Sequence, residues 1–157
     1  MLFIDTETFS ETPIKSGTYR YAEDCEVIII TYAIGDGPIV AIDLPAGDNL
    51  PEELLEAINN PEVLTIAHNS VFDRNVLKKL GINIPIERWR CTMMRAMLHG
   101  LPGSLDKLSD IFKLGDSAKH KEGKKLIHLF CKPNKGVRNN GQSHPQEWAE
   151  FIKLKNI

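Results

Sequence analysis

The sequence has 157 residues, of which 42% are hydrophobic and 25% charged, and these values predict a single domain over residues 1–157 with its own core. No apolar run approaches the roughly 20 residues that a membrane helix needs, and the first residues lack a secretory signal, so we expect a cytoplasmic protein that does not bind membranes. Three cysteines without a CxxC pair argue against a zinc site or disulfides, and a net charge of −2 argues against a general nucleic-acid coat.

The first half of the chain predicts three strands and a helix. Residues 2–8, 27–34 and 38–44 are apolar and β-branched, as in buried strands. Asp36-Gly37 separates the second and third strands and favours a tight antiparallel hairpin, because its turn requires positive φ. A helix is expected over residues 51–59, where Pro51 suits the first turn.

The second half predicts alternating strands and helices. Short strands are expected at 63–67 and 89–91, and a helix at 70–80 that ends at Gly81. Further helices are predicted at 92–99, 104–115, 118–131 and 145–157, with a Gly-, Asn- and Lys-rich loop at 132–144. Three antiparallel strands followed by strand–helix–strand predict an α/β fold, a mixed sheet with additional parallel strands and flanking helices.

The most informative polar residues are three acids. Asp5 and Glu7 lie two apart on the first strand, so their side chains leave the same face. Carboxylates on an otherwise apolar strand are costly to bury unless a cation meets them, although a solvent-facing strand end is the commoner reason for such a pair. Asp73 follows the strand at 63–67, where it is either a third member of the site or part of a Ser70-x-x-Asp73 capping box; Asn69 is an alternative N-cap.

Basic residues are concentrated in one segment. Residues 1–62 contain two, Lys15 and Arg20, whereas residues 113–138 contain eight basic residues and two acids. An acidic half and a basic segment suit a metal centre beside a phosphate-binding surface, while the alternative is a solvated lysine-rich helix and loop. The candidate phosphate contacts are Lys119, Lys121, Lys124, Lys125, Lys135 and Arg138.

These stretches resemble a known family. Asp5-Thr6-Glu7 is similar to the first motif, D-x-E, of the DEDD (DnaQ-like) exonucleases, and Asn69-Ser70-Val71-Phe72-Asp73 to their second. The segments at 17–24, 67–69, 89–93, 101–105, 123–127 and 144–148 resemble phage and bacterial family A DNA polymerases, so the resemblance spans the whole chain. It implies a ribonuclease-H-like fold and a proofreading 3′–5′ exonuclease that hydrolyses DNA.

The resemblance also implies roles for single residues. Asp5, Glu7 and Asp73 would be catalytic and would hold two Mg²⁺ or Mn²⁺ ions, an oxygen-ligand chemistry that suits hard cations. Residues near the substrate would be Thr6, Thr8, Asn69 and Phe72, although both threonines also suit a strand and Phe72 also suits the core. The expected partners are the 3′ end of single-stranded DNA and a DNA polymerase domain.

The third motif of this family, Y-x-x-x-D or H-x-x-x-x-D, is missing. Leu154 stands where the tyrosine would be, and the aspartate would fall one position after Ile157. The sequence therefore predicts a C-terminally incomplete exonuclease domain that is slow or inactive alone. The alternatives are a non-catalytic exonuclease fold that binds single-stranded DNA or a polymerase partner, a domain completed by another chain, and an unrelated α/β protein.

Overall fold

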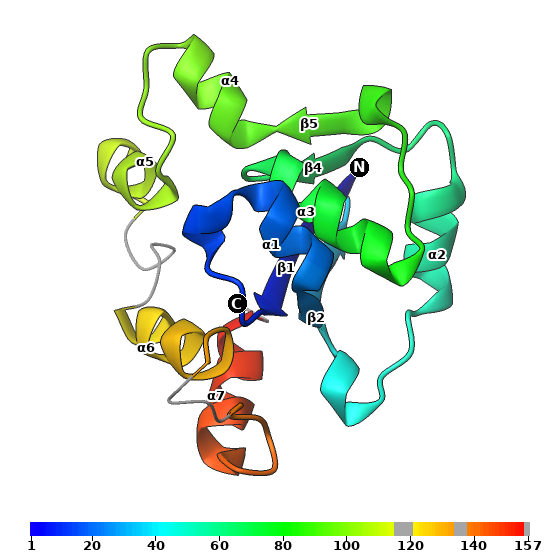
Figure 1. Ribbon diagram of the computed structural model, residues 1–157. Helices are drawn as coiled ribbons and strands as arrows, with labels where there is room; N and C mark the ends of the chain where they lie inside the picture. Colours follow the sequence, from blue (N-terminus) through cyan, green and yellow to red (C-terminus); the bar gives the residue numbers. More distant parts are fainter. Residues whose placement is uncertain (115–120, 134–137, 156–157) are drawn as a thin grey trace.

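The computed structural model describes residues 1–114, 121–133 and 138–155, and five strands in these ranges form one sheet (Figure 1). The strands are β1 (Leu2–Phe9), β2 (Glu26–Ile34), β3 (Val40–Asp43), β4 (Thr65–Ala67) and β5 (Trp89–Cys91). Their order is β3-β2-β1-β4-β5. The pairs β1–β2 and β2–β3 are antiparallel, whereas β4 runs parallel to β1 and to β5. The predicted mixed sheet is therefore confirmed.

Helices follow the strands in the predicted order. The α-helices are α1 (Thr18–Asp24), α2 (Glu52–Asn59), α3 (Ser70–Leu77), α4 (Thr92–Leu98), α5 (Leu105–Phe112), α6 (Lys121–Phe130) and α7 (Pro145–Lys155). The short 3-10 helices are η1 (Ile14–Ser16), η2 (Leu44–Ala46), η3 (Lys78–Leu80) and η4 (Ile86–Arg88). Among the described residues, α1, η1, η2 and η4 were not expected from the sequence, whereas η3 lies within the helix predicted over 70–80.

Glycines end two of these helical segments as the sequence predicts. Gly81 follows η3 with a φ of 76°, and Gly100 lies just past α4 with a φ of 71°. Both values are in the left-handed region, which glycine adopts without the strain of a Cβ atom.

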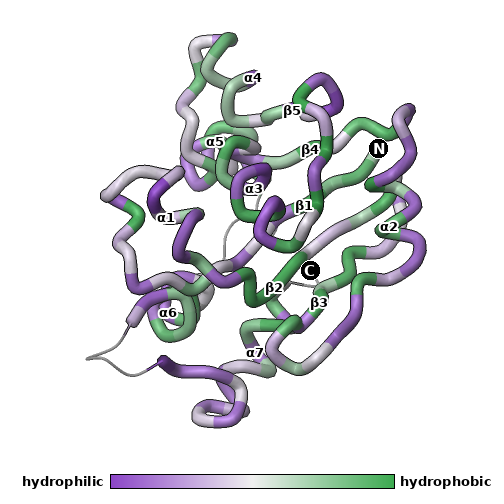
Figure 2. Tube along the Cα trace, turned by 45° about the vertical axis from the view of Figure 1, so that its right-hand side comes forward, coloured by the Kyte–Doolittle hydropathy of each residue, from purple (hydrophilic) through white to green (hydrophobic). Residues whose placement is uncertain are grey.

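Two cores lie on opposite faces of the sheet. The first core joins α1, α2 and α3 to one face of the sheet through residues such as Leu2, Ile4 and Ile30. The second core joins α6 and α7 to the other face, where Phe130, Trp148 and Phe151 stack around Ile29. Figure 2 shows the strands as largely hydrophobic segments between these layers. Successive side chains of β1 and β2 point to opposite faces of the sheet, so the apolar residues of these strands contribute to both cores.

Candidate active site

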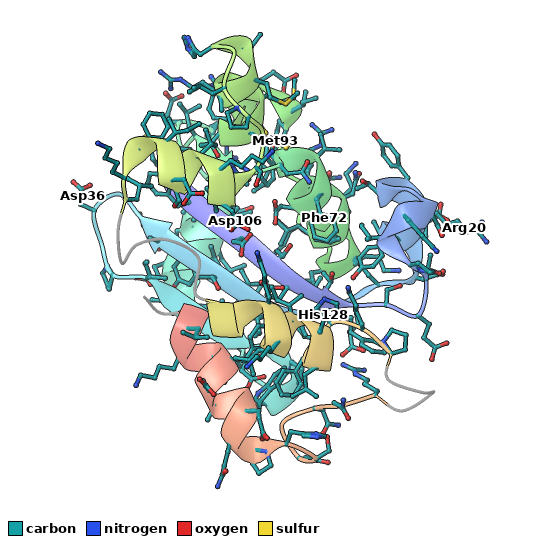
Figure 3. The ribbon with its side chains drawn as sticks, turned by 90° about the vertical axis from the view of Figure 1, so that its left-hand side faces the viewer. Arg20, Asp36, Phe72, Met93, Asp106 and His128 are labelled. Carbon is teal, nitrogen blue, oxygen red and sulfur yellow. The ribbon has the colours of Figure 1, made fainter. Side chains whose placement is uncertain are left out.

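Asp5 and Glu7 leave β1 on the face that carries the second core, as predicted. Asp5 pairs with Thr31 and Glu7 with Ile29 across the β1–β2 ladder. Helices α6 and α7 cover this face near Phe9, so Glu7 is half-buried at their edge while Asp5 is exposed. In Figure 3, β1 runs diagonally between α5 and α6.

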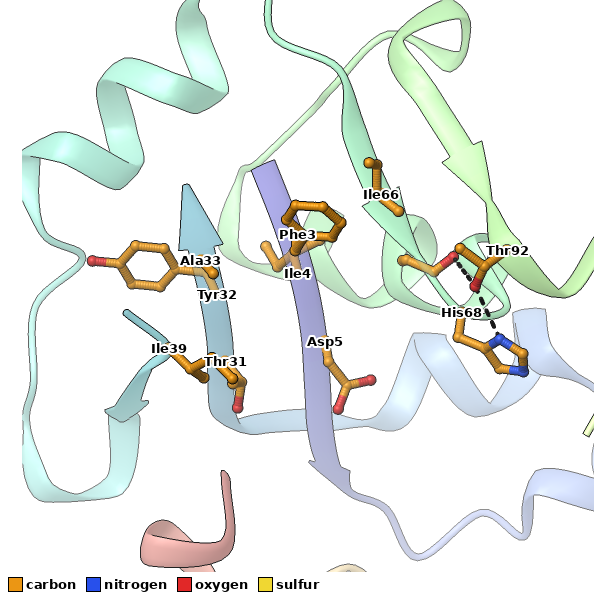
Figure 4. Close-up of a pocket in the computed structure, with 11 residues that line it drawn as sticks. Phe3, Ile4, Asp5, Thr31, Tyr32, Ala33, Ile39, Ile66, His68 and Thr92 are labelled. Carbon is orange, nitrogen blue, oxygen red and sulfur yellow. Dashed lines mark hydrogen bonds between the residues drawn. The ribbon is translucent and has the colours of Figure 1, made fainter. Parts of the chain in front are cut away.

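A shallow cavity of about 260 Å³ lies on the open side of Asp5. Figure 4 shows its lining, in which the Asp5 carboxylate lies beside an apolar surface that includes Phe3, Ile39 and Ile66. His68 borders the cavity and contacts Thr92 Oγ1 at 3.0 Å and the carbonyl oxygen of Gly103 at 2.9 Å. Both ring nitrogens of His68 are therefore used to hold the segment after β5.

Asp73 contacts β1 beyond the end of the β1–β4 pairing. Strand β4 pairs only with Leu2 and Phe3, so the rest of β1 has no strand neighbour on that side. The backbone N–H and the hydroxyl of Thr6 both donate to Asp73 Oδ1, at 3.1 and 2.8 Å. Since Thr6 stands between Asp5 and Glu7, these bonds place the Asp73 carboxylate beside the stretch of β1 that carries the other two acids.

The structure places Asn69, and not Ser70, at the N-cap position of α3. Helix α3 begins at Ser70, so Ser70 is not the N-cap that a capping box requires. Asn69 occupies the N-cap position, but with φ 69° and ψ 49° and without a capping bond from its side chain. The left-handed Asn69 turns the chain from β4 into α3 and so aims Asp73 at β1.

Burial and the nearby negative charge of Asp5 raise the pKa of Asp73. The side chain is only 2% exposed, and this burial, together with the charge of Asp5, raises its pKa from 3.8 to about 7, while the Thr6 hydrogen bonds oppose the rise. Such a pair of carboxylates is unfavourable without a compensating cation. The perturbed acid marks this part of β1 as a candidate functional site.

The donor chemistry of the three acids fits a hard divalent cation. All of the groups are carboxylates, and oxygen ligands are those that Mg²⁺ and Mn²⁺ prefer. Among the described residues, however, no three His, Cys, Asp or Glu side chains are gathered closely enough to form a complete metal site. The three acids therefore supply negative charge and oxygen ligands for a cation, but they do not form a complete coordination shell.

A second, larger cavity of about 570 Å³ lies next to Glu7. Phe72 and Tyr21 line it and contact each other with ring centroids 5.8 Å apart. Phe72 is thus packed against the first core and also lies at the cavity wall. Thr6 and Thr8 also line the cavity, but both are buried, and Thr8 Oγ1 lies 2.8 Å from the Tyr21 hydroxyl.

Cys131 is a contact of the site that the sequence did not indicate. Its thiol donates to Glu7 Oε2 over 3.6 Å, and it lines the larger cavity. The two residues are 124 positions apart, and no motif surrounds Cys131, so only the packing of the segment after α6 against β1 brings them together.

The basic candidates whose side chains the structure describes are Lys124, Lys125 and Arg138, and these three do not converge on the acids. Lys124 forms an ion pair with Asp106 at 3.0 Å, and Arg138 forms two hydrogen bonds with Glu26 at 2.6 and 2.7 Å while lying over the Phe9 ring. Lys125 is exposed on α6. Lys119 and Lys135 lie outside the described residues, as does the side chain of Lys121. In the part of the chain that the structure describes, we find no helix with the length and apolarity for a membrane span.

The chain has one informative curated relative and several structural neighbours. It matches no known protein-family profile. It is 40% identical over 161 residues to the DNA polymerase of Bacillus phage SP02, a match that covers 96% of this chain and 25% of the polymerase. The chain therefore spans about a quarter of the length of this relative.

The fold of the chain is similar to those of three solved structures. Brucella melitensis NrnC with bound Mg²⁺ aligns with a TM-score of 0.57 and 17% identity, over 98% of this chain and 67% of NrnC. NrnC bound to pGG gives a TM-score of 0.56 and 18% identity, over 98% and 69%. A structure described as the apo form of a nuclease gives 0.50 and 19%, over 99% and 64%. By sequence the chain is similar to about a quarter of a phage DNA polymerase, and its fold is similar to that of NrnC.

Proposed function

We propose that the chain is a 3′–5′ exonuclease domain that hydrolyses DNA phosphodiesters with two divalent cations, Mg²⁺ or Mn²⁺, and that it proofreads as part of a DNA polymerase. The observation that carries this proposal is the pair of hydrogen bonds from Thr6 to Asp73, which brings a third acid to the strand of Asp5 and Glu7. Residues 1–157 would form one catalytic domain. The Mg²⁺ in a neighbour of the same fold supports the choice of metal.

The charge of the site explains why a cation is required. Three carboxylates repel a phosphodiester anion, so a substrate can approach Asp5, Glu7 and Asp73 only when positive charge lies between them. When bound, a divalent cation supplies a Lewis acid that activates water and stabilises the charge developing on the phosphate oxygens. The ligands would be Asp5, Glu7 and Asp73, with Thr6 fixing the orientation of Asp73.

The larger cavity suits the terminal nucleotide of the DNA substrate. Its volume of about 570 Å³ is within the range of small-molecule sites, and it lies directly beside Glu7. Tyr21 and Phe72 offer aromatic surface for a nucleobase or sugar, and Lys132 at the cavity lining offers a cation for a phosphate. We assign the terminal nucleotide of a single-stranded 3′ end to this cavity, with Asn69 at the start of α3 as a further contact.

A second function, binding of single-stranded DNA without cleavage, is favoured by one observation. The described residues contain no group of three metal-ligating side chains in close array, so cation binding by this chain alone would be weak. Under this alternative, the same cavity would hold DNA ends, and catalysis would require a further ligand from a polymerase partner or from another chain.

A degradation assay with single-stranded DNA separates the two functions. Oligonucleotides labelled at the 5′ end report stepwise shortening from the 3′ end, and those labelled at the 3′ end report early release of the label. We expect Mg²⁺- or Mn²⁺-dependent shortening from the 3′ end that Asp5→Ala abolishes and the turn variant Asp36→Ala leaves unchanged. DNA binding without shortening in any of the three proteins supports the non-catalytic function, and shortening that survives Asp5→Ala contradicts the proposed site.

A further inference from the structure

Helix α4 and helix α5 expose an unusual amount of apolar surface. Helix α4 has no buried residue, and Met94, Met97 and Leu98 are 49%, 53% and 83% exposed. Helix α5 buries only Leu108 and Ser109 and leaves Leu105, Ile111 and Phe112 largely exposed. We call these six exposed apolar side chains the α4–α5 surface.

A short segment that packs against α4 connects the two helices. The connecting segment packs against α4, because a Cβ atom at Gly103 would lie 3.2 Å from side-chain atoms of both Met93 and Met97. His68 holds the base of this unit through Thr92 and Gly103. Figure 1 places α4 and α5 together at one corner of the molecule, away from α7.

A helix of seven residues gains little stability by itself in water. Most helical stability in proteins comes from burial of an apolar face, and α4 has no fully buried side chain. Contiguous exposed apolar patches are uncommon on isolated globular proteins and mark interaction sites. The α4–α5 surface therefore lacks the covering that its composition calls for.

The composition of the surface favours a protein partner over nucleic acid. Contacts to nucleic acid are made largely by Lys and Arg to phosphates, whereas this surface is built from Met, Leu, Ile and Phe, with Arg95 on α4 and Lys107 on α5 beside them. The relative from phage SP02 is also about four times as long as the matched segment, so in that polymerase most of the polypeptide lies outside this domain.

We propose that the α4–α5 surface packs against the remaining part of a DNA polymerase polypeptide of the SP02 kind. This inference rests on the sequence similarity to the SP02 polymerase and not on the nuclease activity, so its test is independent of catalysis. Packing would cover Met97 and Leu98 and would fix the orientation of the acids relative to the rest of the polymerase.

Methionine oxidation tests the proposal directly. The matched segment of the SP02 polymerase is replaced by this chain, and oxidation by hydrogen peroxide is followed by mass spectrometry in the chimera and in the isolated chain. In the isolated chain, Met94 and Met97 should oxidise at rates similar to that of Met1, which is 60% exposed. In the chimera, both rates should fall at least fivefold, and Leu98→Glu should restore them.

Each other outcome counts against the proposal. Equal oxidation of Met94 and Met97 in both proteins would mean that the surface stays open in the polymerase. Protection already present in the isolated chain, with a dimer in sedimentation velocity, would assign the surface to a second copy. A chimera that fails to extend a primed template would mean that the surfaces do not match. Leu98→Glu in the isolated chain serves as the folding control, because an exposed position should tolerate it without loss of the unfolding transition.

Discussion

The carboxylate of Asp73 accepts two hydrogen bonds from one residue, the backbone N–H and the hydroxyl of Thr6. A buried carboxylate with two donors on one oxygen is held in a single orientation, and here the donors come from the residue between two further acids. The contact joins α3 to β1 at the point where β4 no longer pairs with β1. It is also the feature that links the fold to the proposed chemistry.

Removal of the Thr6 hydroxyl should weaken this link. Thr6→Val keeps the shape of the side chain but deletes the donor to Asp73, so we expect the free energy of unfolding at pH 8 to fall by roughly 1–3 kcal/mol. Thr6→Ser retains the hydroxyl and should lose less. Urea unfolding of the three proteins in EDTA measures the difference, and equal stability of Thr6→Val and the unchanged chain would show that the bond has no energetic role.

The raised pKa of Asp73 makes stability depend on pH. Because the folded chain holds the proton up to about pH 7 while the unfolded chain releases it near 3.8, ionisation should lower the free energy of unfolding as the pH rises between these values. The loss should level off above pH 7 at up to about 4 kcal/mol. It should be absent below pH 4, where both states are protonated.

The variant Asp73→Asn isolates this effect, since it removes the titration and keeps an oxygen that can accept from Thr6. In EDTA, Asp73→Asn should be more stable than the unchanged chain at pH 8, and the difference should shrink towards pH 4. Added Mg²⁺ should raise the melting temperature of the unchanged chain at pH 8 and not that of the variant. A difference that does not change with pH would mean that Asp73 titrates normally.

Two glycines should respond oppositely to alanine. A Cβ atom at Gly141 would lie 2.8 Å from Trp148 Cδ1, and the Trp148 indole N–H donates to Asp43 Oδ2 at 2.6 Å. Gly141→Ala should therefore push α7 from β3 and cost roughly 1–3 kcal/mol. Gly123 lies in α6 with open space around its Cα, so Gly123→Ala should add about 0.5–1 kcal/mol. Thermal unfolding of both variants checks the pair, and a neutral Gly141→Ala would contradict the tight packing.

Lys125 is the described basic candidate whose contribution to DNA binding is simplest to test. If it contacts a phosphate, Lys125→Ala should weaken binding to single-stranded DNA equally for all sequences and reduce the salt slope by about 0.7. Lys153→Ala, an exposed change on α7, is the matched control. Fluorescence anisotropy in EDTA at several salt concentrations measures both, and identical slopes for the two variants would remove Lys125 from the phosphate contacts.

Strand and helix types were predictable where composition dominated. The β-branched run of β2 and Gly81 each specify local geometry, and the antiparallel β2–β3 pair formed as expected. The turn between these strands differs from the prediction, because the positive φ lies at Gly35 (58°) and not at Asp36-Gly37. The predicted first residues of two strands were less accurate. Strand β3 begins at Val40 and not at Pro38, whose ring nitrogen cannot donate to a strand ladder. Strand β4 begins at Thr65, because the N–H of Val63 donates to the Asn60 carbonyl in a turn.

The site was only partly predictable for a physical reason. The shared face of Asp5 and Glu7 follows from the two-residue period of a strand. Whether Asp73 capped α3 or joined the acids depended on how α3 packs beside β1, which is tertiary information. The same holds for Cys131, whose contact with Glu7 spans 124 residues and has no local signature.

Binding of Mn²⁺ tests the central claim most directly. Electron paramagnetic resonance counts free Mn²⁺ during titration of the unchanged chain, Asp5→Asn, Asp73→Asn and the turn variant Asp36→Asn at pH 8. If Asp5, Glu7 and Asp73 form one cation site, the first and last proteins should bind Mn²⁺ alike, and the two site variants should bind at least tenfold more weakly. Equal binding by all four proteins, or none by any, would contradict a cation site at these acids.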